Sequence, residues 1–336
     1  MPSVLDTRGR VLRNLRVSVT DRCNLRCGYC MPEEEYVWLP REDILHFGEI
    51  AALADVFLDL GVDKVRLTGG EPLLRRDLPR LVTMLAALPG IDDLALTTNG
   101  LLLARDAAAL RAAGLQRVTV SLHSLRPATF DRLSGGRGQL PAVLAGIDAA
   151  ANAGLTPIKV NAVVVRGVND DEVAELARFF KRPGFVLRFI EYMDVGHTNG
   201  WRLDDVVPSA EIIRIVGHEF PLEPIGANYP GEVAERWRYL DSDEAEAGEI
   251  GVISSVTHAF CKGCTRARLA TDGKLYTCLF ATQGYDLRAL LRGSSADEEI
   301  INYLAAIWSQ RADRYSEIRS ERTAALPKIE MSYIGG

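Results

Sequence analysis

The chain has 336 residues, with 39 lysines and arginines against 45 aspartates and glutamates, so its net charge is −6. That length is enough for about two domains with a full hydrophobic core. The acidic balance excludes a general attraction to nucleic acid or to an anionic membrane, so any anionic ligand needs a local basic site. No apolar run of about 18 residues and no export leader is visible, which predicts a cytoplasmic protein.

Short β-rich segments alternate with longer amphipathic segments from residue 15 to residue 192. The predicted strands are Leu15–Thr20, Lys64–Thr68, Asp93–Thr97, Arg117–Leu122, Pro157–Val165 and Val186–Tyr192. The predicted helices are Arg41–Leu60, Asp77–Leu88, Leu103–Ala113, Leu140–Ala153 and Asp171–Phe180. Repeated β-then-α units predict a parallel sheet with helices outside. Six units fall short of the eight that close a full barrel, so the sequence predicts a partial, open (β/α)6 barrel of the α/β class.

Two loop-like stretches, Asp194–Pro208 and Pro221–Pro230, interrupt this pattern. We therefore predict a barrel domain of residues 1–220 and a smaller C-terminal α+β domain of residues 221–336. The predicted elements of the second domain are antiparallel strands at Glu232–Leu240 and Gly251–Val256, a hairpin of Ala267–Thr271 and Lys274–Thr277 around Asp272-Gly273, and helices near Leu287–Leu291 and Asp297–Asp313.

Polar residues occupy every second position of several predicted strands. In a barrel, such an alternation puts them in the interior, where Val, Ile and Leu usually pack. Buried cations are costly unless an anion lies among them. The pattern therefore predicts an anion-binding interior, with a solvated sheet face as the alternative. The residues that share a face are Arg16, Ser18 and Thr20 on the first strand, Lys64, Arg66 and Thr68 on the second, and Lys159 and Asn161 on the fifth.

The six cysteines fall into two groups of three. The first triad, Cys23, Cys27 and Cys30, lies directly after the first strand at the spacing C-x3-C-x2-C. Three thiolates in one loop can each bind one iron of a [4Fe-4S] cube and leave the fourth iron open to a substrate or cofactor. A zinc loop, which needs four ligands, and a chance group of buried cysteines are the alternatives.

The second triad is Cys261, Cys264 and Cys278. The predicted hairpin would return Cys278 towards the C-x2-C pair. His258, three residues before Cys261, could complete a Cys3His site. Zinc is therefore an alternative to a second cluster at this triad.

The first triad, with an aromatic residue before its third cysteine and the Gly69-Gly70-Glu71-Pro72 turn after the second strand, resembles the signature of radical S-adenosylmethionine (SAM) enzymes. Taken alone, that turn is a routine strand-to-helix connection. The resemblance implies that SAM binds the open iron of the first cluster and that the Glu71 turn meets its amino group. The implied SAM contacts are Tyr29, Gly70, Glu71, Ser121 and Met193.

The second triad makes the resemblance more specific. The pattern Cys261-x2-Cys-x-Arg-x-Arg-Leu-x2-Asp-Gly-Lys-Leu-x2-Cys278, together with Ile334-Gly-Gly336, is similar to that of the MoaA family, the GTP 3′,8-cyclases of molybdenum cofactor biosynthesis. The similarity runs from about Leu15 to the C-terminus. It implies a second [4Fe-4S] cluster that binds the guanine base, and a Gly-Gly tail that enters the active site. A frayed end and an adenylatable sulfur-carrier end are the other interpretations of the tail.

The family implies a radical reaction in which a 5′-deoxyadenosyl radical abstracts H3′ of GTP and C3′ then bonds to C8. The product is 3′,8-cyclo-7,8-dihydro-GTP. An external one-electron donor, a downstream cyclic pyranopterin monophosphate synthase and a second copy of the chain, as a homodimer, are the implied partners. The implied substrate-binding residues are Arg16, Lys64, Arg66, Thr97, Lys159, Arg188, Arg266 and Arg268, among which Arg16, Arg266 and Arg268 are the candidate catalytic residues.

Two positions depart from the family pattern. His123 stands where Asp is common, and Thr265 stands where Asn is common. Neither is a cluster ligand, so we expect altered local contacts and an unchanged activity. Two rival interpretations are a peptide-modifying radical SAM enzyme, which usually carries more C-terminal cysteines, and a non-catalytic protein whose zinc ribbon docks nucleic acid or a partner.

Overall fold

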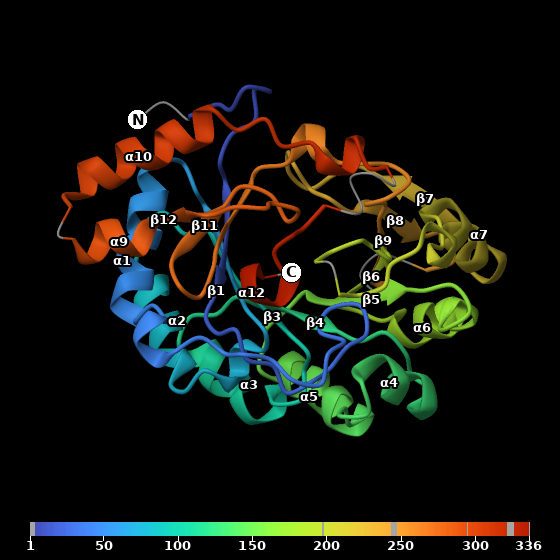
Figure 1. Ribbon diagram of the computed structural model, residues 1–336. Helices are drawn as coiled ribbons and strands as arrows, with labels where there is room; N and C mark the ends of the chain where they lie inside the picture. Colours follow the sequence, from blue (N-terminus) through green and yellow to red (C-terminus); the bar gives the residue numbers. More distant parts are fainter. Residues whose placement is uncertain (1–3, 197, 243–246, 294, 321–325, 336) are drawn as a thin grey trace.

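A computed structural model describes residues 4–196, 198–242, 247–293, 295–320 and 326–335 of the chain. The described strands form one sheet in the order β12-β11-β10-β1-β2-β3-β4-β5-β6-β9-β8-β7. Figure 1 shows this sheet curved around a central space, with the helices of the first part of the chain on its outer side. The sheet does not close on itself, which confirms the predicted open barrel.

The six strands of the first part of the chain run parallel to one another. Each lies within two residues of a predicted strand. Their bounds are Asn14–Ser18 (β1), Lys64–Thr68 (β2), Asp93–Thr98 (β3), Arg117–Ser121 (β4), Ile158–Val164 (β5) and Phe185–Glu191 (β6).

The helices that cover the outer face are α1 (Phe47–Asp59), α2 (Leu78–Ala86), α3 (Leu103–Ala112), α4 (Pro127–Ser134), α5 (Leu140–Asn152), α6 (Val173–Phe180) and α7 (Ser209–Glu219). α4 and α7 lie outside the predicted helices. The prediction of one helix from Arg41 to Leu60 is wrong, because a short 3₁₀ turn at Arg41–Asp43 precedes α1. Between them Leu45 is buried, and its N–H donates to the Thr271 carbonyl at 2.9 Å. A long-range contact therefore overrides the local helical pattern.

The C-terminal part of the chain extends both edges of the sheet. β9 (Glu249–Ile253) pairs in parallel with β6, and β10 (Arg266–Leu269) pairs in parallel with β1, so eight adjacent strands run parallel. β8 (Glu235–Tyr239) is antiparallel to β9, and β11 (Lys274–Tyr276) is antiparallel to β10, as predicted. The remaining elements are β7 (Leu222–Ile225), β12 (Tyr285–Asp286), α9 (Leu287–Arg292), α10 (Asp297–Ser309) and α12 (Met331–Ile334).

β7 lies within the stretch predicted to be a loop. It carries Pro224, which cannot donate to a neighbouring strand, but β7 is the last strand of the sheet and pairs only with β8. Edge strands tolerate proline for this reason. The prediction of a domain boundary at residue 220 stays a prediction.

The hydrophobic core lies between the outer face of the sheet and the helices. Leu15 and Val17 of β1 are fully buried there, as are Leu53 and Phe57 of α1. Because side chains alternate along a strand, the residues between them point into the barrel. None of the helices in the described ranges is long and apolar enough to cross a membrane.

The glycine turn after β2 packs against the backbone that leads into the first cysteine loop. The Gly70 N–H donates to the Thr20 carbonyl and the Glu71 N–H to the Arg22 carbonyl, both at 2.8 Å. A Cβ added at Gly70 would lie 2.3 Å from the Arg22 carbonyl oxygen. This turn therefore fixes the start of the cysteine loop against the end of β2.

We expect Gly70→Ala to lower the free energy of unfolding by about 1–3 kcal/mol, because the added methyl group overlaps backbone that cannot move freely. Chemical unfolding of the metal-free protein measures the change. Gly48→Ala in α1 is the matched control, since a Cβ there meets nothing within 4 Å. The control should be neutral or stabilising by up to about 1 kcal/mol, and an equal loss in both variants would contradict the close approach.

Candidate active site

One cavity of about 270 Å³ occupies the interior of the barrel. Residues from β1 to β6, from β10 and from the C-terminal segment line it. Both cysteine triads reach this one space, although they lie more than 200 residues apart in the chain. The lining cysteines are Cys23, Cys27, Cys30, Cys261, Cys264 and Cys278.

The first triad lies in a tight turn. The N–H groups of Cys30 and Met31 both donate to the Cys27 carbonyl, at 2.9 and 2.8 Å. Burial raises the pKa of Cys27 to about 12, and the neighbouring Cys23 adds to the shift. Burial also raises the pKa of Cys30. These thiols therefore keep their protons until a metal displaces them.

The second triad has a different electrostatic environment. Arg311 and Arg266 donate to the Cys264 sulfur, at 3.2 and 3.4 Å. Burial alone would raise the pKa of Cys264, but the two guanidinium groups outweigh it and lower the pKa to about 6. Burial raises the pKa of Cys278 to about 12, with a contribution from Asp313.

The arrangement of the thiols suits a cluster better than a single ion. In the described ranges, no group of three or more His, Cys, Asp or Glu side chains converges closely enough to hold one metal ion. The His258 side chain is 81% exposed and lies 3.4 Å from Glu235, so a Cys3His zinc site lacks its fourth ligand. Three thiols that line one cavity can hold a [4Fe-4S] cube, because each thiolate binds a different iron.

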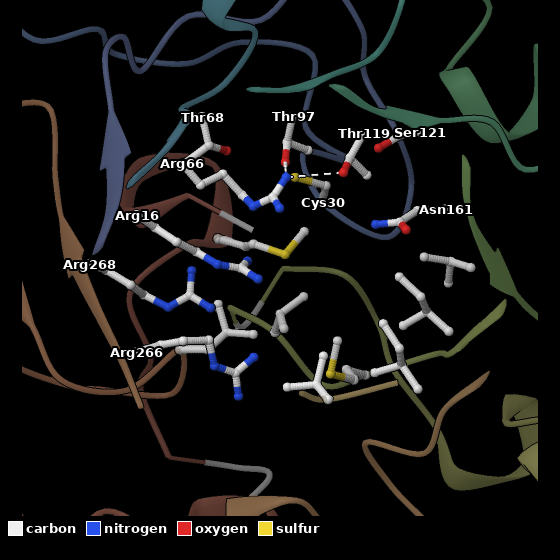
Figure 2. A pocket seen from close by; sticks show the side chains of 18 of the residues that line it. Arg16, Cys30, Arg66, Thr68, Thr97, Thr119, Ser121, Asn161, Arg266 and Arg268 are labelled. Atoms are coloured by element: carbon white, nitrogen blue, oxygen red, sulfur yellow. Dashed lines mark hydrogen bonds between the residues drawn. The ribbon is translucent and has the colours of Figure 1, made fainter. Parts of the chain in front are cut away.

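A row of arginines points into the cavity from adjacent strands (Figure 2). Arg16 on β1 is in register with Arg268 on β10 and with Arg66 on β2. Arg66 donates to the hydroxyl groups of Thr97 and Thr119, at 3.2 and 3.0 Å. Three guanidinium groups thus share one level of the sheet, where neighbouring strands are about 4.8 Å apart.

This positive charge is not balanced by the acidic residues of the cavity. Glu191 and Asp313 are the acidic residues among the described lining residues. Glu191 accepts from the backbone N–H groups of Ser209, Val256 and Thr257, and Asp313 pairs with Arg311. The uncompensated positive charge of the interior therefore favours binding of an anionic ligand.

The pKa values of the cations reflect this imbalance. Burial and the charges of Arg268, Arg266, Arg66 and Arg188 hold the pKa of Arg16 well below its usual range. The Nε of Arg16 is buried without a hydrogen-bond partner among the described residues. Burial lowers the pKa of Arg66 to about 9, with Arg117 and Arg188 adding to the shift. Burial also lowers the pKa values of Arg188 and Arg268 to about 10.

Lys64 and Lys159 do not line this cavity. Each lies two residues before a lining residue on its strand, Arg66 or Asn161, and so about 6–7 Å nearer the strand start. The Lys64 amine lies 3.4 Å from the centre of the Tyr229 ring. Lys159 lines a second cavity at the start of β5 and β6, and burial lowers its pKa to about 7, with Arg188, Arg117 and Arg66 adding to the shift.

The residues expected to contact SAM divide into two groups. Tyr29, Gly70, Ser121 and Met193 line the cavity, and Glu71 does not. The Glu71 carboxylate accepts from the Leu73 N–H at 3.0 Å, the Thr98 hydroxyl at 2.7 Å and the Asn99 N–H at 2.7 Å. Burial raises its pKa to about 7. Its side chain holds the glycine turn together, and its contact with SAM stays a prediction.

His123 contacts Tyr29 of the first cysteine loop. Its Nδ1 accepts from the Val163 N–H at 3.0 Å, and its Nε2 lies 2.8 Å from the Tyr29 hydroxyl. Burial lowers the pKa of His123 to about 4, so the ring is neutral. Since Nδ1 is an acceptor, the proton lies on Nε2 and is donated to the Tyr29 oxygen. Thr265 also lines the cavity, and its carbonyl accepts from the Arg13 and Asn14 N–H groups.

The C-terminal segment lies inside the barrel, where Figure 1 shows α12 at the centre. Met331 and Ser332 of α12 line the cavity, and the Gly335 carbonyl accepts from the Arg268 guanidinium. Gly335 has a φ of +75°, and a Cβ there would lie 2.3 Å from Thr68 Cγ2. Gly336 lies outside the described residues.

Among the lining residues that the sequence predictions miss, Thr119 and Arg311 make the contacts that matter most to the site. Thr119 binds Arg66, and its alternation with Arg117 and Ser121 on β4 is a signal that could have identified it. Arg311 follows α10 and reaches the second triad only through tertiary contacts. No local pattern marks it.

Family models match most of the chain. The radical SAM superfamily matches residues 17–180, and the family described as Molybdenum Cofactor Synthesis C matches residues 185–317. Membership of the radical SAM superfamily brings with it an iron–sulfur cluster and SAM as cofactors.

Curated relatives match over almost their full length. A GTP 3′,8-cyclase of Acidothermus cellulolyticus is 53% identical, over 99% of this chain and 99% of the relative. A GTP 3′,8-cyclase of Xanthomonas campestris pv. campestris is 51% identical, over 98% and 97%. The crystal structure of Streptococcus suis SuiB bound to S-adenosylmethionine is 18% identical with a TM-score of 0.56, covers 92% of this chain and 68% of that one, and shares the fold. With that identity over its full length, the chain belongs to the GTP 3′,8-cyclase family of radical SAM proteins.

Proposed function

We propose that this chain converts GTP to 3′,8-cyclo-7,8-dihydro-GTP in the first step of molybdenum cofactor biosynthesis. The observation that carries the proposal is one barrel cavity lined by two cysteine triads and by a row of unbalanced arginines. A triphosphate supplies the negative charge that these arginines lack. The product differs from GTP by a C3′–C8 bond, and one electron and one proton complete it.

The first triad supports the radical half of the reaction. Cys23, Cys27 and Cys30 would hold the cluster, which together with SAM would supply a 5′-deoxyadenosyl radical for abstraction of the 3′ hydrogen of GTP. The backbone of Gly70 and the side chains of Tyr29, Ser121 and Met193 orient SAM in this proposal. Glu71 acts indirectly, because its carboxylate fixes the turn that carries Gly70.

The second triad and the cations hold the substrate. Cys261, Cys264 and Cys278 bind a second [4Fe-4S] cluster, whose open iron would receive the guanine base. The substrate-binding residues are Arg16, Arg66, Thr97, Arg188, Arg266 and Arg268 around the cavity, with Lys64 and Lys159 deeper in the barrel where the end of the triphosphate would lie. With the base of GTP held at the second cluster and its phosphates held by the cations, C3′ and C8 would stay close together. This lowers the entropic part of the barrier.

Arg16, Arg266 and Arg268 are the proposed catalytic residues. Arg266 donates to the Cys264 sulfur, and so lies where the base would bind. Arg16 lies between Arg268 and Arg66 on the sheet, and burial together with four neighbouring arginines holds its pKa well below its usual range. Arg16 is therefore a candidate to supply the proton that completes the product.

The electron balance needs an external one-electron donor. A downstream cyclic pyranopterin monophosphate synthase and a second copy of this chain are the other proposed partners, on the family resemblance alone.

The reaction can be tested by an anaerobic single turnover of iron-reconstituted protein with SAM, a strong reductant and GTP deuterated at C3′. We expect deuterium in the 5′-deoxyadenosine and a cyclised product of GTP, both read by mass spectrometry. Replacing the first triad by alanine should abolish SAM cleavage, and replacing the second should abolish the cyclised product. Cleavage of SAM without deuterium transfer would remove GTP as the substrate and leave the radical SAM core intact.

Arg16→Met should weaken GTP binding while leaving the nucleotide-free protein at least as stable as the parent. The loss of one charge-assisted hydrogen bond, worth about 1.5–3 kcal/mol, corresponds to about a 10- to 150-fold higher Kd. The stability should not fall, because the change removes a buried cation surrounded by like charges. Calorimetry and chemical unfolding measure the two effects. Arg13→Met, which removes the pair with Asp63 outside the cavity, is the control and should leave the Kd unchanged.

Lys159 should take up a proton when GTP binds near pH 8. The pKa of about 7 leaves the free amine mostly neutral there, and a polyanion nearby raises that pKa. Below about pH 6 the amine is already charged, so the uptake should vanish. Calorimetry in buffers of different ionisation enthalpy measures it. Lys159→Met should lack this uptake at pH 8, and equal uptake in both proteins would show that the amine lies away from the phosphates.

A further inference from the structure

Arg311 is buried beside the second triad, with its side chain only 1% exposed. It lies just after α10 and over the Trp308 ring, 4.5 Å from the ring centre. All three guanidinium nitrogens have partners. Nε donates to the Thr277 carbonyl and to Asp313, both at 3.1 Å, Nη1 to the Cys264 carbonyl at 2.9 Å and to Asp6 at 3.1 Å, and Nη2 to the Cys264 sulfur at 3.2 Å.

These contacts join the two segments that carry the second triad. Cys264 precedes β10, and Thr277 immediately precedes Cys278 after β11. Because a guanidinium group is planar and rigid, its bonds to the Cys264 and Thr277 carbonyls fix the separation of the two segments. The cysteines are therefore held in place before a metal binds.

The bond to the Cys264 sulfur distinguishes this triad from the first one. Within the described ranges, the sulfur of Cys23 accepts from the Leu25 N–H at 3.4 Å and from the Asn99 amide at 3.9 Å, which are neutral donors. The sulfur of Cys264 accepts from two cationic donors, Arg311 and Arg266. Reduction adds negative charge to a cluster, so cationic donors to its sulfurs favour the reduced form.

We propose that Arg311 is a positioning residue of the second cluster, which spaces Cys264 from Cys278 and makes this cluster easier to reduce than the first. The inference rests on the proposed second [4Fe-4S] cluster. It also gives the two clusters an order, in which an added electron resides first at the triad beside the guanine base.

A purely structural ion pair would predict a different response to charge. Asp6 is shared between Arg311 and Arg10, and Asp313 is partly exposed, so neither carboxylate fully offsets the Arg311 charge. If the guanidinium acts on the cluster, removing the Asp313 charge should ease reduction and removing the Arg311 charge should hinder it. A structural pair would leave the potential unchanged when Arg311 is replaced, whereas the Asp313 charge also acts on Cys278 directly.

The test uses full-length protein in which Cys23, Cys27 and Cys30 are replaced by alanine, so that only the second cluster is present. Iron content is measured, and a redox titration is followed by electron paramagnetic resonance. We expect Arg311→Met to reduce the ratio of reduced to oxidised cluster at least tenfold at a fixed potential, which is about 59 mV for one electron. Arg311→Lys, which keeps the charge and loses the fork, should give an intermediate value, and Asp313→Asn should shift the potential the other way.

The matched control is Arg319→Met. Arg319 is also buried and paired, with Asp194 at 2.8 Å, but contacts no cysteine in the described part of the chain, so its variant should keep the parental potential. An unchanged potential in Arg311→Met with full iron content would overturn the inference. If Arg311→Met holds no cluster, Arg311→Lys is measured instead, and an unchanged potential there overturns it. A parent without an iron–sulfur cluster would overturn the second cluster itself, whereas deuterium transfer from GTP is tested separately.

Discussion

Unbalanced positive charge in the barrel interior is the constraint on which the rest of this structure depends. Arg268, Arg16 and Arg66 stand at one level on three adjacent parallel strands, and the acidic residues of the cavity are engaged elsewhere. Such an interior destabilises the empty protein. The aliphatic core between the sheet and the helices must offset that cost. The same arginine side chains therefore lower the stability of the empty protein and favour the binding of an anion.

The pairing of β10 with β1 connects the two parts of the chain into one site. It sets Arg268 beside Arg16 and brings the second triad to the same cavity as the first. The tail completes this arrangement, because Gly335 binds Arg268 within the barrel. Because both the N-terminal and the C-terminal parts of the chain line this cavity, neither part alone forms the site.

Local sequence patterns predict a large share of this architecture. Alternation on the strands correctly puts Arg16, Arg66 and Asn161 in the interior, because a period of two fixes which face a side chain occupies. The same alternation does not determine how far along the barrel a side chain lies. It therefore does not predict that Lys64 and Lys159 lie nearer the strand starts than the cavity. The pairing of β9 and β10 with the barrel edges and the reach of Arg311 depend on contacts between distant segments, which no local pattern encodes.

The order of strands in the sheet also bears on how the chain is made. β1 and β6 form the two edges of the first six parallel strands, and their neighbours β10 and β9 come from the last part of the chain. A growing chain that has left the ribosome only as far as β6 therefore presents two unpaired parallel edges to its surroundings. Such edges recruit other strands, and late non-local pairing is slow. Productive folding of this protein therefore depends on how quickly its final third follows the first two.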